Sequence, residues 1–210
     1  ASDMETPASV MRQAFDAQQS VALALRESSA QDRIAHIKRL RTAMLAQREA
    51  LYAAFAQDMR KSKAEVEGAE IMPVLDEMRH AIKHLKRWMK PQAISATITS
   101  VGSQAQVQYQ PRGRVLIIAP WNYPLNLCFG PLVSAIAAGN TVILKPSEMT
   151  PNVAALMGRI IAQVFDTTQV AYFEGSQTTA QALLALPFDH IFFTGSPAVG
   201  KLVMAAAAKH

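Results

Sequence analysis

Short apolar segments typical of β-strands alternate with longer helical segments after residue 113, and this rhythm constrains the fold more than any other feature. The apolar runs cover residues 115–119, 141–144, 169–173 and 190–193. The helical segments cover residues 125–138, 152–165, 178–186 and 202–208. Nearly continuous apolar strands separated by helices predict an α/β fold with a parallel sheet covered on both faces. Ligands of such sheets bind beyond the carboxyl ends of the strands, so the loops after the strands are the candidate site.

A region with a helical period precedes the predicted sheet. Its clearest helix begins after Ser29, a suitable N-cap residue that is followed three positions later by Asp32. Glutamines then alternate with apolar residues from Gln104 to Gln110, which indicates an exposed strand. We therefore expect three parts: an all-helical amino-terminal layer at 1–90, a connecting strand segment at 91–112, and the sheet domain at 113–210.

The net charge of +5 raises the question of nucleic-acid binding. The densest basic run recurs at helical spacings among apolar residues, which is typical of a helix with one solvated and one packed face. That run consists of Arg79, Lys83, Lys86, Arg87 and Lys90. Since no aromatic platform or known motif accompanies these charges, we expect no nucleic-acid partner.

Location and redox state can also be addressed from composition. No uninterrupted apolar stretch reaches about 18 residues, so we expect no membrane span. Residues 1–7 contain two acidic residues and lack the basic start and apolar core of a secretory signal. The single cysteine, Cys128, excludes an internal disulfide and fits a cytoplasmic protein.

The first strand is followed by Pro120, Trp121, Asn122, Tyr123 and Pro124. Two prolines restrict the backbone of this turn, so that Asn122 is presented from a fixed position. Its side-chain amide can donate a hydrogen bond to an oxyanion. The alternative interpretation is that Asn122 caps the helix that follows.

The second strand leads into Lys145, Ser147 and Glu148. An ammonium group and a carboxylate at the end of a parallel strand suit a ribose, whose hydroxyls can accept from the first and donate to the second. A plain surface ion pair is the alternative.

The fourth strand leads into a glycine-containing loop and a helix. Gly195 and Gly200 flank Ser196, so backbone N–H groups at the start of the helix could approach a diphosphate. The loop does not fit the phosphate-binding motif of nucleotidases, because Leu202 stands where that motif has a Ser or Thr. Glycines that serve only the turn remain the alternative.

Taken together and in this order, the loops resemble those of the aldehyde dehydrogenase superfamily. The strings QPRGRVLIIAPWNYPL, GNTVILKPSE and FDHIFFTGSPAVGK are most similar to its class-3-type and coniferyl-aldehyde branch. The resemblance implies a Rossmann-like domain that binds NAD or NADP. The cofactor-binding residues that it implies are Ile118, Trp121, Lys145, Ser147, Glu148, Gly175, Gly195, Ser196, Val199 and Gly200.

The resemblance also implies a reaction, the oxidation of an aldehyde to a carboxylic acid through a cysteine thiohemiacetal. Asn122 matches the amide that holds the substrate oxygen, whereas the nucleophile and the general base are expected beyond His210. The whole protein is expected to be a homodimer, and this chain alone to be inactive. Two alternatives stay open: an inactive dinucleotide-binding module, and an acyl-phosphate or CoA-acylating reductase of the same fold.

Other reactive side chains fit the site less well. Cys128 lies within a predicted apolar helix, where a buried thiol is expected rather than a nucleophile. His80 and His84 have a zinc-compatible spacing but no evident third ligand, so we expect no metal site. Glu148 would favour a ribose hydroxyl over a 2′-phosphate, while Lys145 would soften that preference, so the choice between NAD and NADP stays open.

Overall fold

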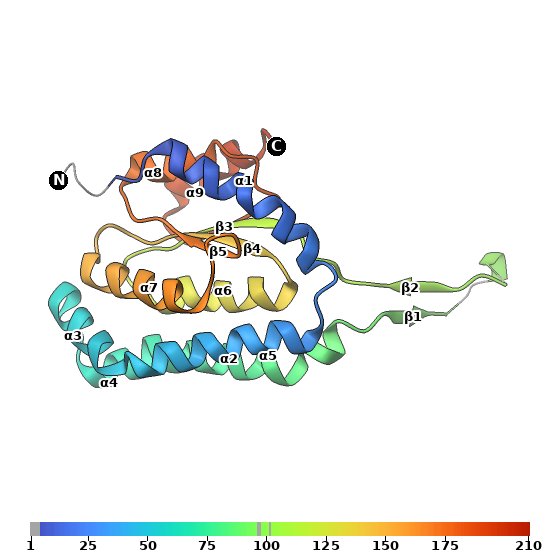
Figure 1. Cartoon of the computed structure of the whole chain (residues 1–210), viewed down its shortest axis with the longest axis horizontal. Coiled ribbons are helices and arrows are strands. Elements are labelled where there is room, and N and C mark those ends of the chain that lie inside the picture. Colours follow the sequence, from blue (N-terminus) through green and yellow to red (C-terminus); the bar gives the residue numbers. More distant parts are fainter. Residues whose placement is uncertain (1–4, 96–97, 101) are drawn as a thin grey trace.

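The computed structural model describes residues 5–95, 98–100 and 102–210, and its centre is a parallel four-stranded sheet (Figure 1). The strand order is β5-β4-β3-β6. The strands are β3 (Arg114–Ile118), β4 (Thr141–Lys145), β5 (Val170–Tyr172) and β6 (His190–Phe193). The predicted α/β fold with a parallel sheet is confirmed, and each strand end lies within one residue of its predicted position.

Side chains of β3 alternate between the two faces of the sheet, as the pleat of a strand requires. Val115 and Ile117 belong to one hydrophobic core, and Leu116 and Ile118 belong to a second core on the opposite face. Burial on both faces explains why β3 and its neighbour β4 read as continuous apolar runs in the sequence.

The first core lies between the sheet and two successive layers of helices (Figure 1). The nearer layer contains α6 (Asn126–Ala138) and α7 (Pro151–Val164). The outer layer contains α2 (Ala30–Ala46), α3 (Arg48–Met59) and α5 (Met72–Trp88), with the short α4 (Lys63–Val66) and the π-helical turn η1 (Glu67–Ile71) between the last two. As predicted, Ser29 caps α2, and its reciprocal hydrogen bonds with Asp32 form a capping box.

The opposite face of the sheet is covered by α1 (Ala8–Leu25), α8 (Gln177–Leu184) and α9 (Pro197–Ala207) (Figure 1). The amino-terminal helices are therefore divided between the two faces, which their helical period did not indicate. Gln18 of α1 is buried and donates to the carbonyl of Val142 in β4 at 3.0 Å. This bond fixes α1 against the sheet.

A two-stranded antiparallel hairpin extends away from the body of the protein (Figure 1). It pairs β1 (Gln92–Ile94) with β2 (Ala105–Val107), and a short 3-10 turn, η2 (Ile98–Ser100), lies between them in the sequence. The exposed strand predicted near 104–110 is confirmed as one half of this hairpin.

The predicted basic run is solvent-exposed along α5 and at Lys90 just after it, while Val74, Met78, Ala81 and Leu85 of the helix are buried. This is the amphipathic helix that the spacing predicted. Within the described ranges, no helix combines the length and the apolar character needed to cross a bilayer. Residues 1–4, which form most of the segment considered as a secretory signal, lie outside the described residues.

Candidate functional site

The loops that follow β3, β4, β5 and β6 meet at the carboxyl edge of the sheet. Strand pairing brings Ile118 opposite Lys145 on one side and opposite Phe193 on the other. The hydrogen-bond ladder continues beyond the strands, since the Ala119 N–H donates to the Lys145 carbonyl at 3.0 Å. The chain order reverses between β3 and β6, and such a switch point is where open parallel sheets bind ligands.

The β3–α6 loop presents Asn122 to solvent. Helix α6 begins at Asn126 with Leu125 as its N-cap residue, and no side chain caps it at that position. The capping interpretation of Asn122 is therefore not supported. A residue between α3 and α4 contacts the backbone of this loop: Lys61 Nζ donates to the carbonyl of Asn122 at 2.8 Å.

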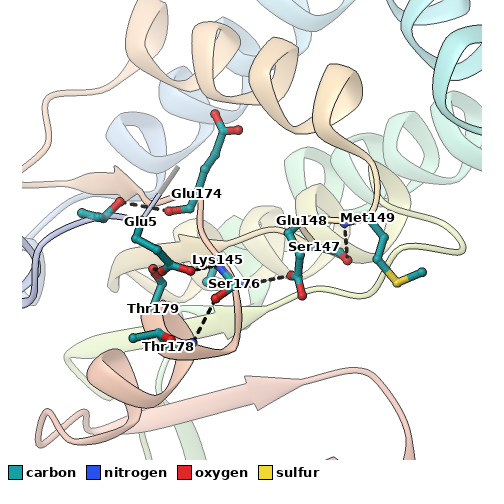
Figure 2. Close-up of polar contacts among 10 residues, drawn as sticks. Glu5, Lys145, Ser147, Glu148, Met149, Glu174, Ser176, Thr178 and Thr179 are labelled. Atoms are coloured by element: carbon teal, nitrogen blue, oxygen red, sulfur yellow. Dashed lines mark hydrogen bonds and ion pairs between the residues drawn. The ribbon is translucent and has the colours of Figure 1, made fainter. Parts of the chain in front are cut away.

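The β4–α7 loop is organised by contacts within itself (Figure 2). Lys145 Nζ lies 3.0 Å from Glu148 Oε2, and the Lys145 side chain is only 5% exposed. The Ser147 hydroxyl accepts from the Met149 N–H at 3.2 Å. Burial opposes ionisation of Glu148, but a backbone hydrogen bond and Lys145 together bring the pKa of its carboxyl below the ordinary value. With its ammonium group buried, this is not a plain surface ion pair.

Gly175, after β5, lies beside the carboxylate of Glu5, which sequence reasoning did not identify. Figure 2 shows Glu5 with its partners Ser176 and Thr179. Glu5 accepts from the Ser176 N–H at 3.1 Å and from the Thr179 hydroxyl at 2.5 Å. These bonds to Ser176 and Thr179 lower the pKa of the Glu5 carboxyl. Gly175 has a φ of 149°, and a Cβ atom there would collide with the side chain of Thr179. Glu5 lies outside any periodic segment, so no sequence signal pointed to it.

The β6–α9 loop begins an exposed helix. The Ser196 hydroxyl accepts from the Val199 N–H at 3.3 Å and caps α9. A Cβ atom at Gly195 would lie 2.5 Å from the tip of the Phe193 ring, so a larger residue at this position would require that ring to move. An open helix N-terminus with a serine cap can bind an anionic group.

The predicted cofactor residues thus occupy one edge of the sheet. Ile118, Lys145, Ser147 and Gly175 are buried there, whereas Trp121 is 49% exposed. Gly195, Ser196 and Val199 are exposed at the start of α9, and Gly200 is half-buried. A buried cation, a neighbouring carboxylate and a helix N-terminus match the ribose and diphosphate groups of a dinucleotide.

Several other features do not belong to this edge. Cys128 is fully buried in α6, and burial raises the pKa of its thiol to about 12, as expected for a structural cysteine rather than a nucleophile. His80 and His84 lie with their ring centroids 4.6 Å apart near Trp88 on α5. A hollow of about 650 Å³ runs along α6 and is lined by Asn126, Asn140, His190 and others.

Sequence reasoning also missed Lys61 and Glu70, which form a buried ion pair beneath the Asn122 loop. One signal was present for Glu70, because it lies between Val66 and Val74 at i, i+4 spacing on the buried stripe of a helical segment. A charged residue on such a stripe needs a partner. No comparable signal marks Lys61.

Comparisons with known proteins agree on one family. The profile described as "Aldehyde dehydrogenase family" matches residues 2–210. The chain is 42% identical to aldehyde dehydrogenase family 3 member B1 of Bos taurus, covering 88% of this chain and 40% of that protein. It is also 42% identical to a probable coniferyl aldehyde dehydrogenase of Pseudomonas aeruginosa, covering 93% of this chain and 41% of that protein. A solved structure, the substrate-bound state of Staphylococcus aureus AldH, gives a TM-score of 0.92 at 38% identity, covering 95% of this chain and 43% of that chain. The chain spans less than half the length of each of these relatives.

Proposed function

Because the chain belongs to the aldehyde dehydrogenase family, as its three loops predicted, we propose that the loops at the carboxyl edge of the sheet bind NAD(P)⁺ and present Asn122 to the carbonyl oxygen of an aldehyde. The whole protein would oxidise that aldehyde to a carboxylic acid through a cysteine thiohemiacetal. One observation carries the proposal: the Asn122 loop and the Lys145–Glu148 loop follow adjacent parallel strands, with Ile118 paired to Lys145. The group that holds the reacting oxygen and the groups that hold the cofactor therefore share one edge.

Asn122 acts on the charge that develops on the substrate oxygen. Its exposed side-chain NH₂ donates to the oxyanion as a nucleophile adds to the carbonyl carbon. The backbone of Asn122 is held by Lys61 before the reaction, which limits reorganisation, and one such donor is worth about 10²- to 10³-fold in kcat.

The cofactor is held by groups that fit a dinucleotide. Lys145 would donate to a ribose oxygen and Glu148 would accept from a ribose hydroxyl, while the N-terminus of α9 at Ser196 would hold the diphosphate. NAD(P)⁺ supplies the hydride acceptor when it is bound. The carboxylate of Glu148 favours a 2′-hydroxyl over a 2′-phosphate, which supports a preference for NAD⁺.

The nucleophile and the general base are proposed to belong to sequence outside these residues. Cys128 is unsuited to attack because its thiol is buried and its pKa is raised to about 12. The proposal also keeps the expectation of a cytoplasmic homodimer. The exposed hairpin offers a surface for pairing through Ile94 and Val107, which are 51% and 40% exposed.

The test uses the whole natural protein with aromatic and medium-chain aldehydes and either cofactor. We expect NADH formation that depends on the aldehyde and yields the free acid, and we expect Asn122→Ala to lower kcat about 10²-fold with little change in the Kd for NADH. A product that forms only with CoA or phosphate would favour an acylating reductase. Saturable NADH binding with no turnover of any aldehyde would favour an inactive binding module.

A further inference from the structure

The β3–α6 loop is fixed by two charged side chains that reach it from the outer helical layer. Lys61 follows α3, and Glu70 lies in the π-helical turn η1. In the sequence they precede Asn122 and Asn126 by 61 and 56 positions. In space they meet at the point where the loop enters α6.

Glu70 uses both of its carboxylate oxygens. Oε1 accepts from Lys61 Nζ at 2.7 Å, and Oε2 accepts from the backbone N–H of Asn126 at 3.0 Å. The side chain of Asn126 adds a bond to the carbonyl of Ala69 at 3.2 Å, which ties η1 to the first turn of α6. A carboxylate at a helix N-terminus is stabilising, and here it substitutes for the N-cap side chain that α6 lacks.

Lys61 connects Glu70 to the loop itself. Its ammonium group donates to Glu70 and also to the carbonyl of Asn122 at 2.8 Å, and it lies 4.4 Å from the ring centroid of Tyr123. The contact with the Tyr123 face is a cation–π interaction. One ammonium group thus contacts both Asn122 and the residue after it.

Burial makes this arrangement costly unless every group is paired. The Lys61 and Glu70 side chains are 8% and 0% exposed. Burial raises the pKa of the Glu70 carboxyl, while Lys61 and the Asn126 N–H act in the opposite direction. Apolar residues would often stabilise a fold as well as a buried ion pair does. Stability alone therefore does not explain the pair. The direct bond from Lys61 to Asn122, whose side chain is presented to the substrate, supports a further role.

We infer that the Lys61–Glu70 pair positions the Asn122 amide for the oxyanion, by anchoring the Asn122 carbonyl and the start of α6. The inference rests on the proposed function, because it needs Asn122 to be the oxyanion donor. Lys61 and Glu70 are positioning residues and make no contact with substrate themselves. Since a displacement of about 1 Å can cost about 10²-fold in rate, loss of the anchor should reduce kcat strongly.

The experiment removes both charges at once in the whole natural protein. Lys61→Met/Glu70→Gln leaves no unpaired buried charge, and we expect kcat for aldehyde oxidation to fall about 10- to 100-fold. The Kd for NADH, measured by fluorescence titration, should change less than kcat, because Lys145 and Glu148 lie in another loop and only Trp121 of the proposed cofactor residues adjoins Asn122. Lys61→Arg keeps the charge and should recover part of the kcat. Lys63→Met is the matched control, because the Lys63–Glu49 pair is exposed, and it should leave kcat unchanged.

A double-mutant cycle that combines Lys61→Met/Glu70→Gln with Asn122→Ala distinguishes positioning of Asn122 from a general structural role. If the pair acts through Asn122, adding Lys61→Met/Glu70→Gln to Asn122→Ala should lower kcat no further. The positioning role would be overturned if the reductions in kcat multiplied in the combined variant, or if Lys61→Met/Glu70→Gln left kcat unchanged. Either result would leave the proposed function standing. If Asn122→Ala alone kept full activity, the proposed oxyanion donor would be wrong and the inference would fail with it. Should the doubly neutral variant not fold, Lys61→Arg with and without Asn122→Ala carries the same test.

Discussion

The two loops that follow β3 and β4 lie side by side, but they are held in different ways. The β4–α7 loop is held by contacts over two or three positions, between Lys145 and Glu148 and between Ser147 and Met149. The β3–α6 loop is held by Lys61 and Glu70, which come from a separate helical layer. The start of α7 also receives a carboxylate from the outer layer, since Asp58 of α3 accepts from the backbone N–H groups of Asn152 and Val153 at 3.3 and 2.9 Å. The Lys145–Glu148 contact on the proposed cofactor side is thus local in the chain, whereas the contact with the Asn122 carbonyl depends on tertiary packing.

The largest expected effect is on the free energy of unfolding, which should depend more on the carboxylate at the β3–α6 loop than on that of the β4–α7 loop. Glu70→Ala leaves the ammonium of Lys61 buried without its partner, so the free energy of unfolding should fall by about 3 to 5 kcal/mol. Glu148→Ala also leaves a buried ammonium, that of Lys145, without its carboxylate, but it should cost less, because the Glu148 side chain is 43% exposed and water can take its place. Urea unfolding midpoints of the whole protein and its variants measure both.

The exposed pair provides the control for this measurement. Glu49→Ala removes an acidic partner whose side chain is 78% exposed, and the midpoint should hardly move. A loss for Glu148→Ala as large as that for Glu70→Ala would show that the two loops do not differ in how they are held.

The same difference decides what the sequence could predict. The strands and the Lys145–Glu148 pair follow from patterns a few residues long, since apolar runs and i, i+3 spacings are local. The oxyanion candidate Asn122 was also visible, because two prolines frame it in the sequence. These features need no knowledge of which helix packs on which face.

Contacts between distant segments could not be predicted in this way. The position of α1 on the opposite face from α2 depends on the path of the chain between them, which no periodicity records. Glu5 reaches Thr179 across 174 positions. Glu70 alone left a trace, as a charge on a buried helical stripe, but that trace does not name Lys61 as its partner.

The second prediction concerns cofactor choice and should have a smaller effect. Glu148→Gln removes the charge that repels a 2′-phosphate, so affinity for NADPH relative to NADH should rise about tenfold, or about 1.4 kcal/mol. Fluorescence titration with each reduced cofactor measures the ratio. Glu70→Gln should leave that ratio unchanged, because Glu70 bonds to the other loop. A change of equal size in both variants would contradict the separation of the two sides.

The smallest effect is a difference in the sign of a pH dependence. Burial raises the pKa of Glu70 above its ordinary value of 4.5, so the folded state binds that proton more tightly than the unfolded state. The stability of the natural protein relative to Glu70→Gln should therefore be greatest at low pH and fall as the pH rises from 4.5 through the folded pKa.

Glu148 should behave in the opposite way. Although burial opposes its ionisation, its backbone hydrogen bond and Lys145 lower its pKa below 4.5. Its contribution relative to Glu148→Gln should be complete above pH 4.5 and be lost as the pH falls through the lower folded pKa. Urea midpoints of the three proteins between about pH 2 and about pH 8 provide the comparison. If the stability difference between the natural protein and each variant changed with pH in the same direction, the two carboxylates would share one kind of environment. Opposite slopes would show that the carboxylate at the Asn122 loop is held in a fully buried site and that of Glu148 in a partly exposed one.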